Sequence, residues 1–137
     1  MDISNLKRDT ARIEAGEWID EIPLLPDVRF KVRGIGSRVY RVRLDRLARA
    51  VPRNGRQSDG SLKIDVAARI TGEAMAEEIL LDWEGLTDNG KPLPYSKERA
   101  LALLTNPDFE DFANAVSYAA AVVQNGRESV AEQTEGN

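Results

Sequence analysis

Residues 85–91 have the residue types and spacing of a phosphate-binding loop, with two glycines, four residues between them and a lysine after the second. Such a loop holds phosphate with backbone N–H groups and the lysine, and a following Ser or Thr coordinates magnesium. Here Pro92 stands at the hydroxyl position, and Pro94 prevents the helix whose N-terminus would face the phosphate. The sequence therefore favours a surface turn built on Asn89 and Gly90.

Carboxylates are the other groups whose spacing could support chemistry, because the chain contains no cysteine and no histidine. Without those residues it cannot build a thiolate metal site, a nucleophilic cysteine or a Ser-His triad. Five carboxylates lie on neighbouring turns of a predicted helix: Glu73, Glu77, Glu78, Asp82 and Glu84. They lack the alternating spacing of a calcium loop, so we predict a solvated face or an acidic surface matched to arginines. We expect a non-enzymatic protein with no catalytic residue, metal or cofactor.

Basic residues are concentrated in one part of the chain. Ten of the 19 lysines and arginines lie within residues 29–56, where Asp45 is the only acidic residue, although the net charge is -4. This segregation indicates an internal match with acidic segments or a basic face for a partner. Nucleic-acid binding is the alternative, since these arginines could follow a line of phosphates. The overall acidity, and Tyr40 as the only aromatic among the arginines of residues 37–51, make nucleic acid the less favoured partner.

An alternating pattern predicts the strand that carries the first of these basic residues. Val28, Phe30 and Val32 alternate with Arg29, Lys31 and Arg33. Residues 17–22 are expected to pair with it, which gives an antiparallel hairpin over about residues 16–34. Two strands need a helix to cover their apolar face.

Four helices are predicted to supply that cover, over about residues 37–51, 64–83, 96–105 and 107–124. Ser37 and Ser96 suit the N-cap position, Asp65 is a candidate cap, and Pro107 fits a first turn. The first helix has an apolar stripe at Tyr40, Leu44, Leu47, Ala48 and Val51. Arginines occupy the rest of its circumference: Arg38, Arg41, Arg43, Arg46 and Arg49.

These elements predict an α+β fold that is mainly α, with an N-terminal β-hairpin packed on a small bundle of about four helices. A chain of 137 residues with 42% hydrophobic and 31% charged residues is sufficient for one globular domain, which we place at residues 1–124. Residues 125–137 are polar and acidic, and we expect them to be disordered. No apolar run approaches a membrane span and the N-terminus is unlike a signal peptide, so we expect a cytoplasmic protein.

The run LLDWEGLTDNGKPLPYSKERALALLTNPDFEDF, residues 80–112, combines several recognisable elements. It contains a Trp-x-Gly element at Trp83 and Gly85, an acidic Asn-Gly turn, Pro-Leu-Pro-Tyr with a Ser cap, and a short helix before Pro107. This combination resembles the tail assembly chaperones of long-tailed bacteriophages, prophages and gene-transfer particles. Gly16-Glu17-Trp18, followed by FKVRG at residues 30–34, is similar to the N-terminal part of such proteins.

The resemblance implies a small, mainly helical, non-enzymatic protein that coats the tape-measure protein before tail-tube subunits polymerise around it. Family members are normally absent from the finished particle, and many have a longer frameshifted product that recruits tube protein. It therefore implies the tape-measure protein as partner, with tail-tube protein as a second candidate and self-association as an open question. A structural tail or neck component is a further alternative.

On this hypothesis the partner contacts a rigid turn between two helices, together with the arginine helix. Trp83 and Tyr95 bracket that proline-containing turn and would anchor it. The predicted apolar contacts are Trp83, Leu86, Leu93 and Tyr95, and the predicted charged rim is Arg38, Arg41, Arg46 and Arg49.

Overall fold

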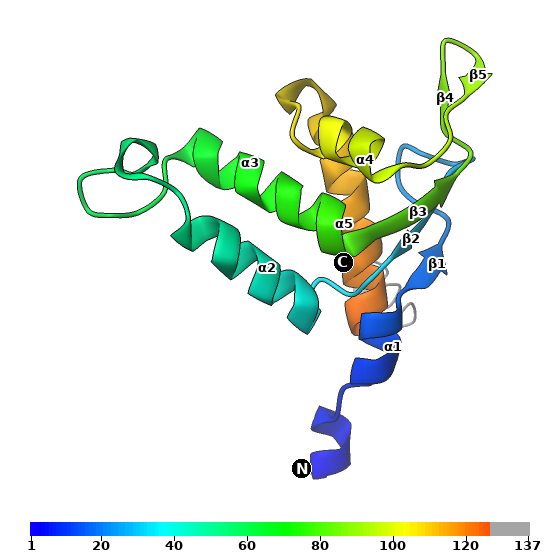
Figure 1. Cartoon of the computed structure of the whole chain (residues 1–137). Helices are drawn as coiled ribbons and strands as arrows, with labels where there is room; N and C mark the ends of the chain where they lie inside the picture. Colours follow the sequence, from blue (N-terminus) through cyan, green and yellow to red (C-terminus); the bar gives the residue numbers. More distant parts are fainter. Residues whose placement is uncertain (127–137) are drawn as a thin grey trace.

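A three-stranded antiparallel sheet forms one side of the computed structural model, which describes residues 1–126 (Figure 1). The strands follow one another across the sheet as β1 (Glu17–Ile19), β2 (Arg29–Val32) and β3 (Leu80–Glu84) (Figure 1). Trp18 lies opposite Lys31 in the β1–β2 pair, which confirms the predicted hairpin. Phe30 and Val32 are fully buried whereas Arg29 is exposed, as alternation along a strand requires.

The third strand was not predicted, and the helix expected over residues 64–83 is wrong beyond residue 79. The chain instead forms α3 (Ile64–Ala74), a π-helical turn η3 (Met75–Ile79) and then β3. A bulge opposite Val32 makes Leu81 an extra residue, so Leu80 and Trp83 both lie on the buried face. A spacing of three residues is also that of a helix face, which is why the pattern favoured a helix. The strand is favoured over the helix because its pairing with β2 satisfies the backbone N–H and C=O groups on the second edge of β2.

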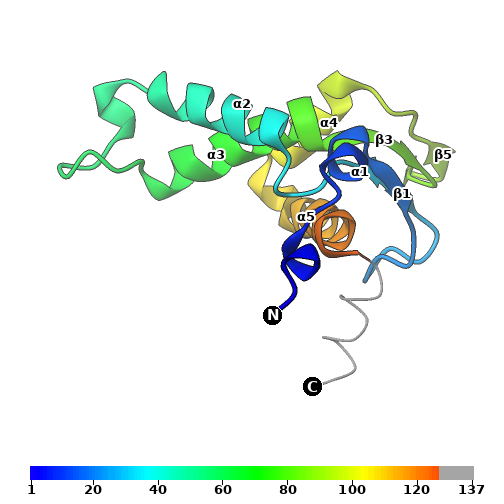
Figure 2. The same cartoon turned by 90° about the horizontal axis from the view of Figure 1, so that it is seen from below.

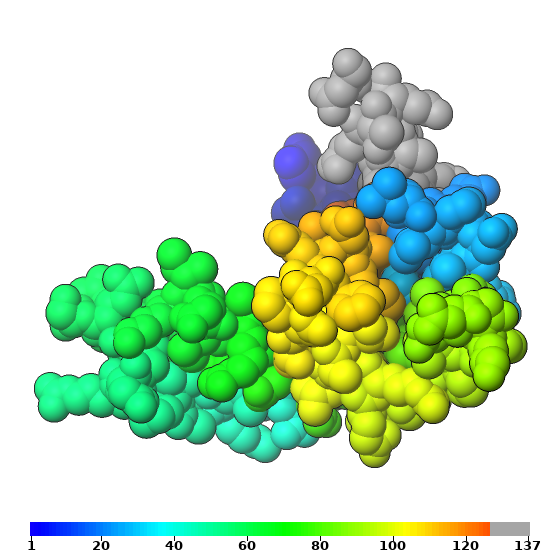
Figure 3. Space-filling view, turned by 90° about the horizontal axis from the view of Figure 1, so that it is seen from above, coloured from blue at the N-terminus to red at the C-terminus, as the bar shows by residue number. Residues whose placement is uncertain are grey.

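Five α-helices accompany the sheet in the described residues, and their mixture with strands confirms the α+β class. Besides α3 they are α1 (Thr10–Ala15), α2 (Arg38–Arg49), α4 (Lys97–Leu104) and α5 (Glu110–Asn125). Short 3-10 turns are η1 (Ile3–Leu6), η2 (Arg53–Gly55) and η4 (Pro107–Phe109). α5 packs against β1 and β2, while α2 and α3 lie side by side (Figures 1 and 2). The α2–α3 pair projects as an arm from the body formed by the sheet, α4 and α5 (Figure 3).

Side-chain caps fix the starts of two helices. The Ser37 hydroxyl accepts a hydrogen bond from the Tyr40 N–H at the start of α2, and the Ser96 hydroxyl accepts one from the Arg99 N–H at the start of α4. Both predicted caps are therefore confirmed. Asp65 is not a cap, because α3 already begins at Ile64 and the acidic side chain falls in its first turn, where the helix dipole favours it.

Three aromatic rings join the sheet to α5 in the core. The Phe30 and Phe112 rings meet edge to face with centroids 5.5 Å apart, and the Trp83 ring meets Phe112 at 6.1 Å. Gly72 of α3 allows another close contact, since a Cβ there would stand 2.2 Å from the Leu104 carbonyl oxygen. The close approach of α4 therefore requires glycine at this position of α3.

The segment with phosphate-loop spacing is a hairpin instead. Its strands are β4 (Thr87–Asp88) and β5 (Lys91–Pro92), which are antiparallel. Asn89 and Gly90 have φ values of 49° and 81°, the backbone conformation of a tight two-residue hairpin turn. The predicted surface turn is confirmed, and no helix begins where a phosphate would need one.

Asn125 is the last residue of α5, and the disorder predicted for the tail otherwise falls on residues 127–137, outside the described part. Within residues 1–126, none of the helices combines the length and hydropathy needed to cross a membrane.

Candidate functional site

The outer face of α2, on the side turned away from the core, is the candidate functional site. The buried side of α2 carries Tyr40, whose pKa is raised by burial. Around the rest of the helix the sequence places five arginines, and Arg38, Arg41 and Arg46 are exposed. Between them lie Val39 and Val42, which are 42% and 49% exposed. The face thus combines positive charge with uncovered apolar surface.

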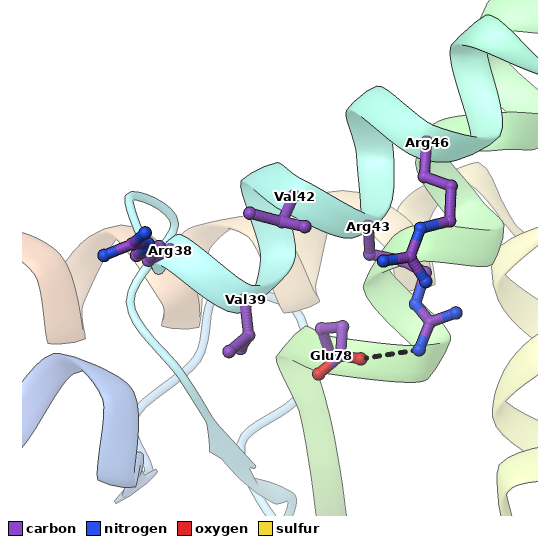
Figure 4. A pocket seen from close by; sticks show the side chains of 6 residues that line it. All are labelled: Arg38, Val39, Val42, Arg43, Arg46 and Glu78. Carbon is purple, nitrogen blue, oxygen red and sulfur yellow. Dashed lines mark hydrogen bonds and ion pairs between the residues drawn. The ribbon is translucent and has the colours of Figure 1, made fainter.

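A shallow hollow of about 240 Å³ follows this face of α2 (Figure 4). It is lined by Arg38, Val39, Val42, Arg43, Arg46 and Glu78. All of these belong to α2 except Glu78, which comes from the π-helical turn η3. A second, wider hollow of about 760 Å³ lies between α1, the start of α2 and the end of α5, and it shares Arg38 and Val39 with the first. The N-terminal half of α2 is therefore accessible from both sides.

Glu78 forms the fixed polar wall of the smaller hollow. Its carboxylate accepts hydrogen bonds from Arg33 and from Arg43, each at 3.2 Å. The Arg33 guanidinium also donates to the Glu78 carbonyl oxygen at 2.9 Å. The Glu78 side chain is only 18% exposed and is held by two charged partners. Arg33 lies directly after β2, and Arg43 lies in α2. Of the five clustered carboxylates, Glu78 therefore provides the predicted match with the arginine helix, through Arg43.

The remaining arginines of α2 differ in how their charge is compensated. Arg49 pairs with Asp45 at 3.0 Å, but both side chains are largely exposed, so this pair contributes little to stability. Arg38, Arg41 and Arg46 form no side-chain ion pair with any residue in 1–126. Three exposed guanidinium groups on one helix thus keep their full capacity to pair with carboxylates or phosphates.

Glu14 joins α1 to the start of α2 next to this face. Its carboxylate accepts a hydrogen bond from the Ser37 hydroxyl at 2.8 Å and another from the Arg38 backbone N–H. Burial acts to raise the pKa of Glu14, but these hydrogen bonds and the charge of Arg33 outweigh it, and the pKa is lowered. The anion position at the N-terminus of α2 is therefore filled by a side chain of the protein itself.

The turn predicted to anchor a partner is a structural junction. Trp83 is 4% exposed, its indole N–H donates to the Leu93 carbonyl oxygen at 2.7 Å, and its ring meets Tyr95 edge to face at 5.0 Å. The Tyr95 hydroxyl donates to the Leu80 carbonyl oxygen at 2.9 Å. Burial, followed by the charges of nearby carboxylates, raises the pKa of Tyr95. Trp83 is not an exposed anchor: with Tyr95 it ties β3 to the segment before α4.

Leu86 and Leu93 are half-buried and pack against the same core cluster. The structure thus separates the eight predicted contact residues into two places. The four arginines share α2, whereas the four apolar residues gather at the β3–α4 junction.

Val39 and Val42 were missed as site residues by the sequence analysis, which considered Glu78 only as one of five clustered carboxylates. The sequence did contain a signal for the valines. Both lie outside the apolar stripe that begins at Tyr40, and they are three residues apart among the arginines of the same helix. The sequence did not distinguish Glu78 from the other four carboxylates, since the π-helical turn that places it beside α2 has no distinctive sequence pattern.

Three other carboxylates of the cluster seen in the sequence each lie near a separate basic residue. Glu73 lies near Arg69, Glu77 near Lys97, and Glu84 is bonded to Arg29 at 2.6 Å. In the described part of the chain, no three acidic side chains are grouped as ligands for one metal ion.

Comparison with known proteins identifies a family for the chain. No curated protein and no solved structure matches it. A family model described as YdaY prophage protein matches residues 35–137, which include α2, the β3–α4 junction and α5. Because this match covers most of the 137 residues, the protein belongs to the YdaY prophage protein family.

Proposed function

We propose that this prophage protein is a tail assembly chaperone, which binds the tape-measure protein during tail morphogenesis and catalyses no reaction. Membership of a prophage family supports a role in phage biology. The resemblance of residues 80–112 to tail assembly chaperones supports the specific role. In this proposal the protein acts in the cytoplasm of the host bacterium, has tail-tube protein as a second partner, self-associates where the partner requires several copies, and is absent from the mature particle.

The observation that carries the proposal is the exposed face of α2. A chaperone for a long helical protein needs apolar surface for repeated contacts and charges that keep the complex soluble. Val39 and Val42 supply apolar surface, Arg38 and Arg46 border it, and Arg41 adds a third uncompensated positive charge on the same helix. This helix is therefore the proposed contact with the tape-measure protein.

The β3–α4 junction has a different role in the proposal. Trp83 and Tyr95 bond to backbone carbonyl groups across the junction, so they hold the position of α4 relative to the sheet. α4 in turn packs against α3 through the glycine contact at Gly72. The residues that carry the family resemblance thereby support the α2–α3 arm that binds the partner.

Co-expression with the tape-measure gene of the same prophage tests the proposal. An affinity tag on this protein is expected to recover the tape-measure protein and to increase its soluble fraction. The tube protein of the same prophage, expressed without the tape-measure gene, serves as a comparison. Failure to recover the tape-measure protein, together with no gain in its solubility, would overturn the proposal.

Nucleic-acid binding is the second candidate function, and the three uncompensated arginines of α2 are the observation that favours it. Binding to duplex DNA through phosphates would weaken steeply as the salt concentration rises. A salt titration that starts at low ionic strength distinguishes the two functions, because the chaperone proposal expects no DNA binding even there.

A structural tail or neck component would make the same contacts but would stay in the particle. Peptide mass spectrometry of purified particles separates these roles. The chaperone proposal expects peptides of this protein in lysates from induced cells and none in the particles.

A further inference from the structure

Val39 and Val42 form an apolar strip on the outer face of α2. Exposed apolar residues are ordinary when they are scattered, but these two are three residues apart and line the same hollow. Arg38 and Arg46 border the strip, and Arg43 and Glu78 close one side of it (Figure 4). An apolar strip with charged borders is typical of a surface that receives one face of an amphipathic helix.

The charge on the borders defines what the arriving helix must carry. The Arg43 guanidinium is already paired with Glu78, whereas the guanidinium groups of Arg38, Arg41 and Arg46 form no ion pair within residues 1–126. This positive face persists on a chain whose net charge is -4. A partner with carboxylates beside its apolar face would compensate all three guanidinium groups, and a basic partner would be repelled.

We infer that the outer face of α2 binds an acidic amphipathic helix, whose apolar side chains cover Val39 and Val42 and whose carboxylates pair with Arg38, Arg41 and Arg46. The inference rests on the proposed function only for the owner of that helix, which would be the tape-measure protein. α2 has 12 residues and is therefore about 18 Å long, enough for about three turns of a partner helix beside it.

Phosphates would satisfy the arginines but not the valines. A nucleic-acid backbone has no apolar surface to cover Val39 and Val42, and the described part of α2 offers one aromatic residue, Tyr40, which is buried. An acidic helix satisfies both kinds of residue at once. The combination of exposed valines and unpaired arginines therefore favours a protein partner over nucleic acid.

Fluorescence anisotropy with a synthetic probe tests this chemistry directly. The probe is a labelled helical peptide with leucines at i, i+3 and i+7 and glutamates on both sides of them. Saturable binding to the full chain is expected, and Arg38→Glu/Arg46→Glu is expected to weaken it about tenfold or more. Val39→Ser/Val42→Ser is expected to weaken binding as well, because it removes the apolar cover while all arginines stay.

Two controls keep the result specific to the α2 face. Lys63→Glu/Arg69→Glu reverses the same number of charges on and before α3, where both side chains are exposed, and is expected to leave peptide affinity unchanged. A peptide with lysine in place of every glutamate is expected not to bind. Thermal unfolding of each variant checks that it folds. The four positions substituted on α2 are exposed, so polar residues are expected to be tolerated there.

Equal peptide affinity for wild type and both α2 variants would overturn the inference. So would tighter binding of a short DNA duplex than of the acidic peptide, or concentration-dependent dimerisation through α2 without peptide binding. Tape-measure recovery distinguishes this failure from that of the proposed function. Recovery that persists in Arg38→Glu/Arg46→Glu overturns the α2 site alone, and no recovery by wild type overturns the proposed function.

Discussion

The indole N–H of Trp83 donates a hydrogen bond to the carbonyl oxygen of Leu93 across 2.7 Å, and this bond links β3 to the segment that leads into α4. The same ring is almost completely buried between Tyr95 and Phe112. One side chain therefore joins the sheet, α5 and the start of the α4 segment. Its loss is expected to affect the whole core.

Trp83→Phe is expected to reduce the free energy of unfolding by about 2–4 kcal/mol, since it leaves the Leu93 carbonyl oxygen unpaired and opens space beside Phe112. Urea titration followed by circular dichroism measures this loss. Trp18→Phe is a matched control because Trp18 is half-exposed on the sheet, and it is expected to cost less. An equal effect of the two substitutions would contradict a special role for the junction.

Gly72→Ala tests the close approach of α3 and α4. Alanine in a helix interior is ordinarily favoured by about 1 kcal/mol over glycine. Here the new methyl group would meet the Leu104 carbonyl oxygen at 2.2 Å, so we expect a net loss of about 1–3 kcal/mol. Thr71→Ala on the exposed side of the same helix is the control and is expected to be neutral or slightly stabilising. A more stable Gly72→Ala variant would contradict the contact.

Glu14→Gln is expected to destabilise the protein at neutral pH by about 1 kcal/mol, because a neutral amide replaces the anion at the N-terminus of α2. The folded-state pKa of Glu14 is lowered, so its ionic contribution is present above the ordinary glutamate pKa and is lost as the pH falls through the lower folded value. Urea midpoints of wild type and variant should therefore converge in acid. A constant difference across that range would contradict the role of charge.

Tyr40 and Tyr95 predict a loss of stability in alkali. Burial raises the pKa of both phenols, so both stay protonated in the folded state at a pH where the unfolded chain ionises. Their contribution is complete below the ordinary tyrosine pKa of about 10 and is lost as the pH rises through the folded values. Tyr40→Phe/Tyr95→Phe should flatten the stability profile above about pH 10. An unchanged slope would contradict this assignment.

The sequence predicted the elements whose signals are local. Alternation at Phe30 and Val32 was sufficient for β2, and the hydroxyls of Ser37 and Ser96 marked two helix starts, because each signal depends only on neighbouring residues. β3 could not be found in this way. Leu80 and Trp83 share a face only because of a bulge opposite Val32, and that bulge depends on a partner strand distant in sequence.

The candidate site was predictable to a similar extent. The arginines of α2 were identified from their density in the sequence, and the structure leaves Arg38, Arg41 and Arg46 exposed as expected. The apolar part of the predicted site was placed around Trp83, which is buried, whereas the structure exposes Val39 and Val42 beside the arginines. Whether Val39 and Val42 are exposed depends on how α2 packs against α3 and η3, and the residue pattern along one helix does not specify that packing.

The most direct test of tape-measure binding through α2 is the recovery of the tape-measure protein by the tagged chain. Recovery by wild type is compared with recovery by Arg38→Glu/Arg46→Glu and by Lys63→Glu/Arg69→Glu. Equal amounts of each folded variant are co-expressed with the tape-measure gene, and the recovered protein is quantified. Recovery by wild type and by the α3 control is expected, together with a loss of about tenfold for the α2 variant. No recovery by the wild-type chain would contradict binding of the tape-measure protein.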